Sequence, residues 1–225
     1  MMDPLLQAII DGDLKTIDEL LKHTRELARS RIASDRFIEA IPHWLYVEDT
    51  PLHLAAASLQ VDVAKLLIKT GAEVNATNRR GAPPLHYACD PRPRCGTWNP
   101  VRQGQMIDLF VKHGSQVDIA DRGGATALHR AVRARSPAAV RHLLRAGANI
   151  NSRLGKHRST PLHLAVQSTG AGGTAGAIKE QLEIIEILMA HGANPLAKDT
   201  AGKTVLDSAR SPKILDALKG SMHKS

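Results

Sequence analysis

Thr50-Pro51-Leu52-His53-Leu54-Ala55 is the stretch that decides how this chain of 225 residues folds, because it returns at regular intervals. The same six positions are occupied unchanged at 160–165, with substitutions at 83–88 and 126–131, and in a more altered form at 204–209. Copies therefore start at 50, 83, 126, 160 and 204, which are 33, 43, 34 and 44 residues apart. A period near 33, with about ten extra residues in two of the units, predicts a solenoid of stacked repeats.

Each full copy carries the residues of a helix-turn-helix unit. A Thr-Pro pair favours a helix start, because the hydroxyl caps unpaired backbone N–H groups and proline suits the first helical position. A second apolar run follows at helical spacing, as in Val61, Ala64, Leu67 and Ile68, and Gly71 comes directly after it. Glycine accepts the left-handed conformation that ends a helix. One such unit cannot enclose a core alone, so neighbouring units must stack.

The motif, its period and the downstream glycine together make this chain resemble the ankyrin repeat. The resemblance implies an all-α solenoid of about six helix-turn-helix units, with short β-hairpin fingers between them. It treats residues 1–225 as a single array, with units that start near residues 3, 50, 83, 126, 160 and 204. The first unit lacks the Thr and His of the motif, and the last has Asp207 in place of His, so both are expected to cap the array.

Three insertions, at about 24–49, 92–101 and 169–178, interrupt the repeat. The longest, 24–49, contains Phe37, Trp44 and Tyr46, half of the chain's aromatic residues. Buried aromatics usually belong to a core, which favours an extra helix that ends at Pro42 and packs its aromatics over the first two units. The alternative is an aromatic binding patch.

The two shorter insertions separate the helices of the third and fifth units. The first contains Trp98, which either folds back onto its own helices or serves as an exposed anchor for a partner. The second is rich in glycine, but no strand precedes it and its spacing matches neither a dinucleotide-binding nor a Walker sequence. A flexible connection is the expected role, and no nucleotide or other cofactor is expected to bind there.

The net charge of +8 is concentrated in residues 79–158, which carry 15 Lys and Arg against four Asp and no Glu, a balance of +11. Thirteen of these cations are arginine, whose planar guanidinium suits carboxylate and phosphate groups. This basic belt predicts an acidic partner, although the same charge would also keep the protein dispersed in solution.

In the ankyrin family, partners usually contact the fingertips and the exposed side of the first helix of each unit. The resemblance, applied position by position, implies ten partner-binding residues: Asn78, Arg79 and Arg80 on one finger, Asp121 and Arg122 on the next, Arg153, Lys156, His157 and Arg158 on a third, and Arg133 one helical turn after His129. Arg141 and Arg145 lie four residues apart on a second helix and are expected on the opposite, convex side.

Catalytic and metal-binding chemistry is not expected. The four motif histidines recur once per unit, so they cannot converge on one ion; the resemblance implies that each ring bonds backbone in the adjoining finger. His86, Cys89 and Cys95 offer three ligands without an evident fourth, and neither zinc nor a disulfide is favoured. No nucleophile elbow, Walker loop or His-Glu-x-x-His motif is present.

These features predict a non-catalytic, intracellular protein-interaction scaffold that binds an acidic protein. No signal-peptide pattern and no apolar stretch of membrane-spanning length are visible, and two cysteines fit a reducing cytoplasm. The chain is expected to be monomeric and to avoid membranes. The alternative function is polyanion or nucleic-acid binding through the arginine belt, which has little aromatic interleaving.

Overall fold

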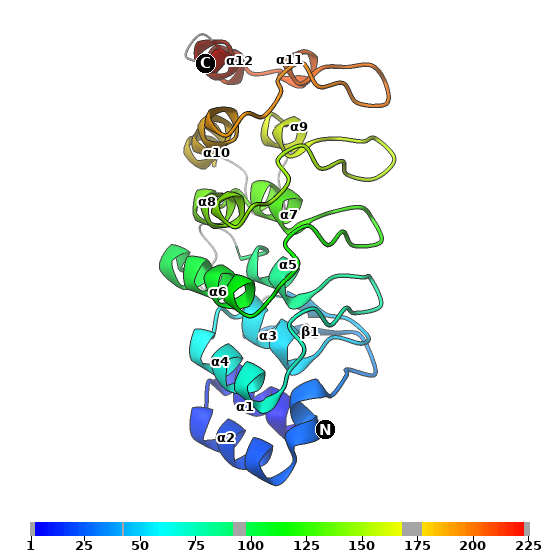
Figure 1. Cartoon of the computed structure of the whole chain (residues 1–225), viewed down its shortest axis with the longest axis vertical. Coiled ribbons are helices and arrows are strands. Elements are labelled where there is room, and N and C mark those ends of the chain that lie inside the picture. Colours follow the sequence, from blue (N-terminus) through cyan, green and yellow to red (C-terminus); the bar gives the residue numbers. More distant parts are fainter. Residues whose placement is uncertain (1–2, 42, 92–97, 168–176, 223–225) are drawn as a thin grey trace.

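The computed structural model of the chain describes residues 3–41, 43–91, 98–167 and 177–222. Helices follow one another in antiparallel pairs along the long axis of the molecule (Figure 1). The pairs are α1 (Pro4–Asp11) with α2 (Leu14–His23), α3 (Pro51–Ala57) with α4 (Val61–Thr70), α5 (Pro84–Ala88) with α6 (Pro100–Lys112), α7 (Ala127–Arg133) with α8 (Pro137–Arg145), α9 (Pro161–Ala165) with α10 (Ile178–Ala190), and α11 (Val205–Ser208) with α12 (Pro212–Met222). The expected all-α solenoid is confirmed.

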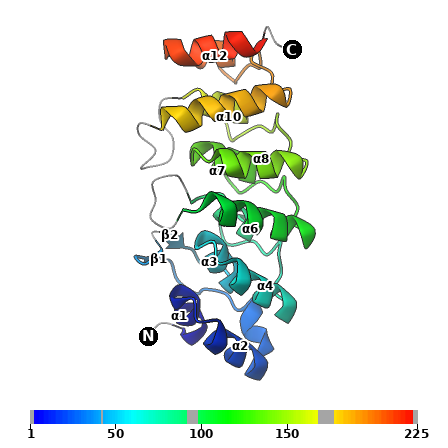
Figure 2. The ribbon, with the colours of Figure 1, turned by 90° about the vertical axis from the view of Figure 1, so that its left-hand side faces the viewer.

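The helices form two layers. First helices of the pairs contact one another in the order α1, α3, α5, α7, α9 and α11, and second helices do so in the order α2 to α12 (Figure 2). Small and branched side chains fill the space between the layers, among them Ala55, Leu85, Ala131 and Ile184, which are completely buried. Each pair thus closes its core against its neighbours, as a one-dimensional array requires.

The motif histidines cap the start of three first helices, α3, α7 and α9. The backbone N–H and the hydroxyl of Thr50 both donate to Nδ1 of His53, at 3.0 and 2.9 Å, and Nε2 donates to the Ala82 carbonyl at 3.0 Å. His129 and His163 repeat the arrangement with Thr126 and Thr160. The second ring nitrogens of His86, His129 and His163 face the carbonyls of Ile119, Ser159 and Lys203. The predicted structural role of these rings is confirmed.

Loops that we call fingers, at residues 72–82, 115–125, 148–159 and 193–203, project from one side of the stack (Figure 1). Three of them turn around one side-chain oxygen: Oδ1 of Asn78, Asp121 or Asp199 accepts two backbone N–H groups across the turn. Neighbouring fingers also bond directly, since Arg122 N–H donates to the Arg80 carbonyl at 2.9 Å and Thr200 N–H to the His157 carbonyl at 3.1 Å. Hydrogen bonds therefore join neighbouring fingers into one surface beside the first helices.

Residues 24–49 do not form the extra helix predicted for them. They fold into a short 3-10 helix, η1 (Arg25–Arg29), and an antiparallel hairpin of β1 (Arg36–Ile38) and β2 (His43–Leu45). The hairpin occupies the position of a first finger, because Arg79 N–H donates to the Val47 carbonyl at 3.0 Å. Pro42, expected to end a helix here, lies outside the described residues.

The other two insertions fall largely outside the described residues, which omit 92–97 and 168–176. The glycine-rich prediction therefore stays a prediction. Trp98 is described, and its indole N–H donates to Oε1 of Gln103 on α6 at 3.0 Å. This tryptophan folds back onto its own helix pair, as the first of the two interpretations expected.

Candidate partner-binding groove

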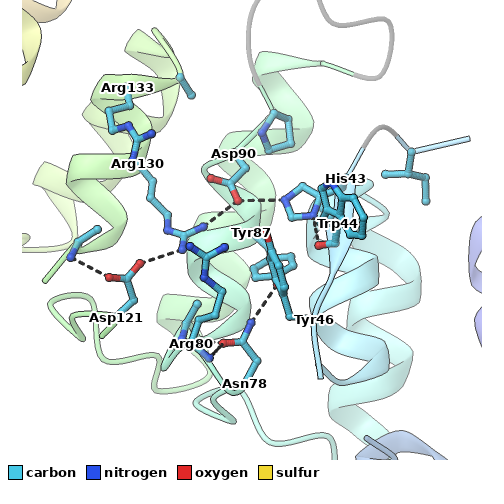
Figure 3. Close-up of a pocket in the computed structure, with 16 residues that line it drawn as sticks. His43, Trp44, Tyr46, Asn78, Arg80, Tyr87, Asp90, Asp121, Arg130 and Arg133 are labelled. Carbon is cyan, nitrogen blue, oxygen red and sulfur yellow. Dashed lines mark hydrogen bonds and ion pairs between the residues drawn. The ribbon is translucent and has the colours of Figure 1, made fainter. Parts of the chain in front are cut away.

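A cavity of about 340 Å³ opens between the hairpin, the first helices α3, α5 and α7, and the fingers (Figure 3). His43, Trp44 and Tyr46 line it from the hairpin strand β2 and the residue after it. Arg130 and Arg133 line it from α7, which lies across from the hairpin, at the left of Figure 3. The hairpin thus turns one part of the groove beside the first helices into a walled pocket.

The floor of this pocket is an ion-pair network that joins three repeats. Arg130 donates to Asp90 at 2.9 Å and to Asp121 at 3.0 Å, and His43 contacts the same Asp90 oxygen at 3.0 Å. Figure 3 shows Asp90 between His43 and Arg130. Burial alone would raise the pKa of Asp90, but Arg130 and His43 outweigh it and lower that pKa to about 2. Burial would lower the pKa of His43, yet Asp90 outweighs it and raises that pKa.

A second, fully buried network supports the hairpin side of the pocket. The Tyr87 hydroxyl donates to Asp49 at 2.7 Å, and the Asn78 amide donates to Asp49 at 2.8 Å and to the Tyr87 oxygen at 3.0 Å. Burial and the charge of Asp49 raise the pKa of Tyr87, so the phenol stays protonated. These contacts connect α5 with the turn of the 72–82 finger and with the segment that follows the hairpin.

Above the floor, arginines gather on the finger side. The guanidinium of Arg80 lies 4.7 Å from the centre of the Tyr46 ring, a cation–π distance. A further hollow of about 620 Å³ extends the pocket toward the fingertips, lined by Arg79, Arg80, Arg122 and Arg133 among others. Arg80, Arg122 and Arg133 are exposed, and none of them pairs with a carboxylate in the part of the chain that the structure describes.

Two residues expected to contact a partner have internal roles instead. Asn78 is 3% exposed and its side chain bonds Asp49, Tyr87 and the backbone of its own turn. Asp121 holds the next turn and pairs with Arg130. Three of the four finger turns use a side-chain oxygen at this position as an acceptor, and that use accounts for both residues.

The remaining expected residues differ in how much of each side chain is available. Arg79 pairs with Asp35, and Arg153 donates to the carbonyls of Arg158 and Lys198, which clips its finger to the next. Lys156, His157 and Arg158 are exposed on the tip of the third finger. The expected control residues Arg141 and Arg145 belong to α8 in the layer of second helices, where Arg141 pairs with Glu183 at 2.8 Å.

Sequence reasoning missed Arg130 and the hairpin. Arg130 belongs to the basic belt, but it lies one residue after the motif histidine, and only the fold brings Asp90 and Asp121 against it. Arg135 was likewise counted with the belt, yet it is 2% exposed and donates to the carbonyls of Ala165 and Gln167. Their spacing in the sequence carries no signal that separates them from the exposed arginines.

The described residues contain no group of three or more His, Cys, Asp or Glu side chains placed to hold a metal ion. Cys89 is buried, burial raises the pKa of its thiol, and Cys95 lies outside the described residues. Among the described helices, none is long and apolar enough to cross a membrane.

Comparison with known proteins agrees with this geometry. The family model for ankyrin repeats (3 copies) matches residues 5–94 and 101–199, which is most of the chain. The chain belongs to the ankyrin-repeat family. Ankyrin repeats are protein–protein interaction modules and are generally non-catalytic.

Relatives of the chain include larger ankyrin-repeat proteins. It is similar to the mouse B-cell lymphoma 3 protein homolog, with 30% identity over 77% of this chain and 35% of that protein, and to mouse ankyrin repeat and SOCS box protein 16, with 34% identity over 72% and 25%. It is 26% identical to human B-cell lymphoma 3 protein over 96% of this chain and 49% of that protein. The chain thus spans between a quarter and a half of the length of these relatives.

Proposed function

We propose that this chain is a non-catalytic scaffold that binds an acidic protein partner along its fingers and the groove beside them. The observation that supports this most is the row of exposed cations on that side. Arg80, Arg122, Arg133, Lys156 and Arg158 come from three successive repeats, and none has a carboxylate partner among the described residues. The two acidic residues that line the pocket, Asp90 and Asp121, do not balance these cations, because both already pair with Arg130.

The positive charge of this row would attract an acidic partner. Like charges arranged along one face raise the rate of encounter with an oppositely charged partner, and the effect weakens with salt. The layer of second helices differs, because Arg141 is already paired with Glu183 there. We further propose that residues 1–225 act as a single array, as one copy, in the cytoplasm.

The test begins with affinity capture from the native host and identification of the bound proteins. Affinity is then measured at low and high salt for two charge-reversed variants. One replaces Arg80, Arg122, Arg133 and Lys156 by Glu; the other, a control, replaces Arg141 and Arg145 by Glu. The first set should lose most of its affinity at low salt while the control keeps it, and both should unfold near the wild-type denaturant concentration.

Two results would contradict the proposal. Wild-type affinity in the finger set, or an equal loss in the control pair, would leave the cations without a binding role. Duplex DNA that competes with the captured protein, with the steep log-linear salt dependence of phosphate contacts, would favour the polyanion function instead.

A further inference from the structure

The hairpin presents two large aromatic side chains to solvent at the edge of the pocket. Phe37 is 47% exposed and Trp44 is 50% exposed. They are directly opposite each other in the β1–β2 register, with ring centres 5.7 Å apart. Trp44 itself lines the pocket. The other four aromatic residues, Tyr46, Tyr87, Trp98 and Phe110, are buried or half-buried, so among the aromatics this pair alone is exposed in the part of the chain that the structure describes.

Packing does not require the pair to face outward. Ile38 and Leu45 alternate with the two aromatics along the same strands and are 5% and 0% exposed, so the core already takes one face of the hairpin. The other face could carry polar residues at no cost to that core. Paired exposed aromatics beside a cavity are typical of a contact for a partner, since such side chains carry much of the binding energy of interfaces.

The hairpin is held at several points, so the aromatic pair has a defined position. His43 pairs with Asp90, Val47 N–H donates to Asp35 at 2.8 Å, and Arg79 pairs with Asp35 from the next finger. Tyr46, which follows β2, lies beneath the guanidinium of Arg80. A rigid aromatic surface costs less entropy when it binds than a mobile one would.

Cations from the fingers and from α7 complete the site. Arg80 and Arg133 line the same cavity as Trp44, while both acidic residues of that cavity are already paired with Arg130. A ligand that fits both parts of the site has a large apolar side chain that contacts the hairpin and carboxylates that pair with the two arginines. Arginine suits carboxylates because it presents paired N–H donors.

We propose that the Phe37–Trp44 hairpin and the Arg80–Arg133 side of the pocket form one specificity site for an extended acidic segment of a partner protein that carries an aromatic or large aliphatic residue. This rests on the proposed function above and adds the apolar requirement to it. The hairpin lies in the insertion at 24–49, so the requirement comes from this chain's own departure from the repeat.

The experiment uses the full chain and three fluorescein-labelled peptides. The first alternates Glu and Gly around a central Trp, the second has Ala in place of that Trp, and the third keeps Trp but has Gln in place of Glu. Binding is followed by fluorescence anisotropy at low salt for wild type and for Trp44→Ala, Phe37→Ala and Arg133→Gln. Val101→Ala serves as a matched control, because Val101 is 65% exposed on α6 and does not line the pocket.

Wild type should bind the acidic Trp peptide about tenfold more tightly than the acidic Ala peptide, the scale of one buried aromatic anchor. Trp44→Ala should remove this difference, Phe37→Ala should reduce it, and Val101→Ala should leave it intact. Arg133→Gln should weaken both acidic peptides, and the Gln peptide should bind more weakly than its Glu counterpart.

The possible failures are distinguishable. If wild type binds both acidic peptides equally, or Trp44→Ala keeps the difference, the hairpin site is wrong and the acidic-partner function stands. If the Gln peptide binds as tightly as the acidic Trp peptide, the role of Arg80 and Arg133 is wrong. If no acidic peptide binds wild type at low salt, the proposed function fails together with the site.

Discussion

Pro83 leaves the Nδ1 atom of His86 without a hydrogen bond among the described residues. In the repeats that begin with Thr50, Thr126 and Thr160, a threonine N–H and hydroxyl both donate to the corresponding ring nitrogen. Proline has neither donor, so the third repeat carries a buried unpaired acceptor at the start of α5.

Replacing Pro83 by Thr should therefore stabilise the protein. The new residue restores two donors to His86, worth about 1 kcal/mol net once the lost rigidity of proline is subtracted. Urea unfolding followed by circular dichroism would measure the change. The reverse substitution, Thr126→Pro, provides the control and should destabilise by a similar amount or more. A Pro83→Thr protein less stable than wild type would contradict the account.

Stability should fall as the pH drops below neutral. Burial lowers the pKa of His53, His86, His129 and His163, that of His86 to about 4 with help from the charge of Arg130. These rings are neutral when folded, so their contribution is complete above the unfolded value of about 6.5 and is lost as pH falls, for His86 through about 4.

His43 acts in the opposite direction, because its raised pKa contributes stability below about 6.5 that is lost as pH rises. The four histidines whose pKa is lowered outweigh His43, the one histidine whose pKa is raised, in their effect on stability. The urea midpoint should therefore be lower near pH 5 than near pH 7.5. His129→Leu should flatten the dependence, because it removes one of the rings whose pKa is lowered by burial. A urea midpoint that rises toward acid pH would contradict the prediction.

Arg130→Met should be strongly destabilising. The side chain is 17% exposed and pairs with both Asp90 and Asp121, so its loss leaves two partly buried carboxylates without this cation. The expected cost is about 3 kcal/mol in the free energy of unfolding. Arg133→Met, three residues later and exposed, should cost less than about 0.5 kcal/mol. Equal costs for the two variants would show that the network does not hold the repeats together.

Gly104→Ala should disturb the contact between α6 and α8. A Cβ atom at Gly104 would lie 2.7 Å from Cε1 and 2.9 Å from Cδ2 of His142, whose ring contacts Asp108 at 2.7 Å. Overpacking of this kind costs about 1–3 kcal/mol, partly offset by the better helix propensity of alanine.

The double variant Gly104→Ala/His142→Ala tests that cause. It should recover stability relative to Gly104→Ala, and a double-mutant cycle from urea unfolding would give the coupling between the two positions. Additive effects would mean that the close approach of these residues does not explain the loss.

The repeat architecture was readable from the chain alone because its signals are local. Thr50, Pro51 and His53 begin a helix wherever they recur, and Gly71 ends one with a positive φ of 112°. Each repeat contacts only its neighbours, so a pattern within one repeat length carries most of the folding information. The role of the motif histidines was predictable from the resemblance to the ankyrin repeat, and the contacts of His53 and His86 with the adjoining fingers agree with it.

Only the tertiary structure decided which cations face a partner and what the 24–49 insertion does. Arg130, Arg133 and Arg135 lie within six residues of one another, yet one is in an ion-pair network, one is exposed and one is buried against backbone carbonyls. Those outcomes depend on residues about 30 to 40 positions away, such as Asp90 and Ala165. The insertion has no repeat to copy, and contacts with Asp90 and Asp35 hold its hairpin in place, with Phe37 and Trp44 turned to solvent.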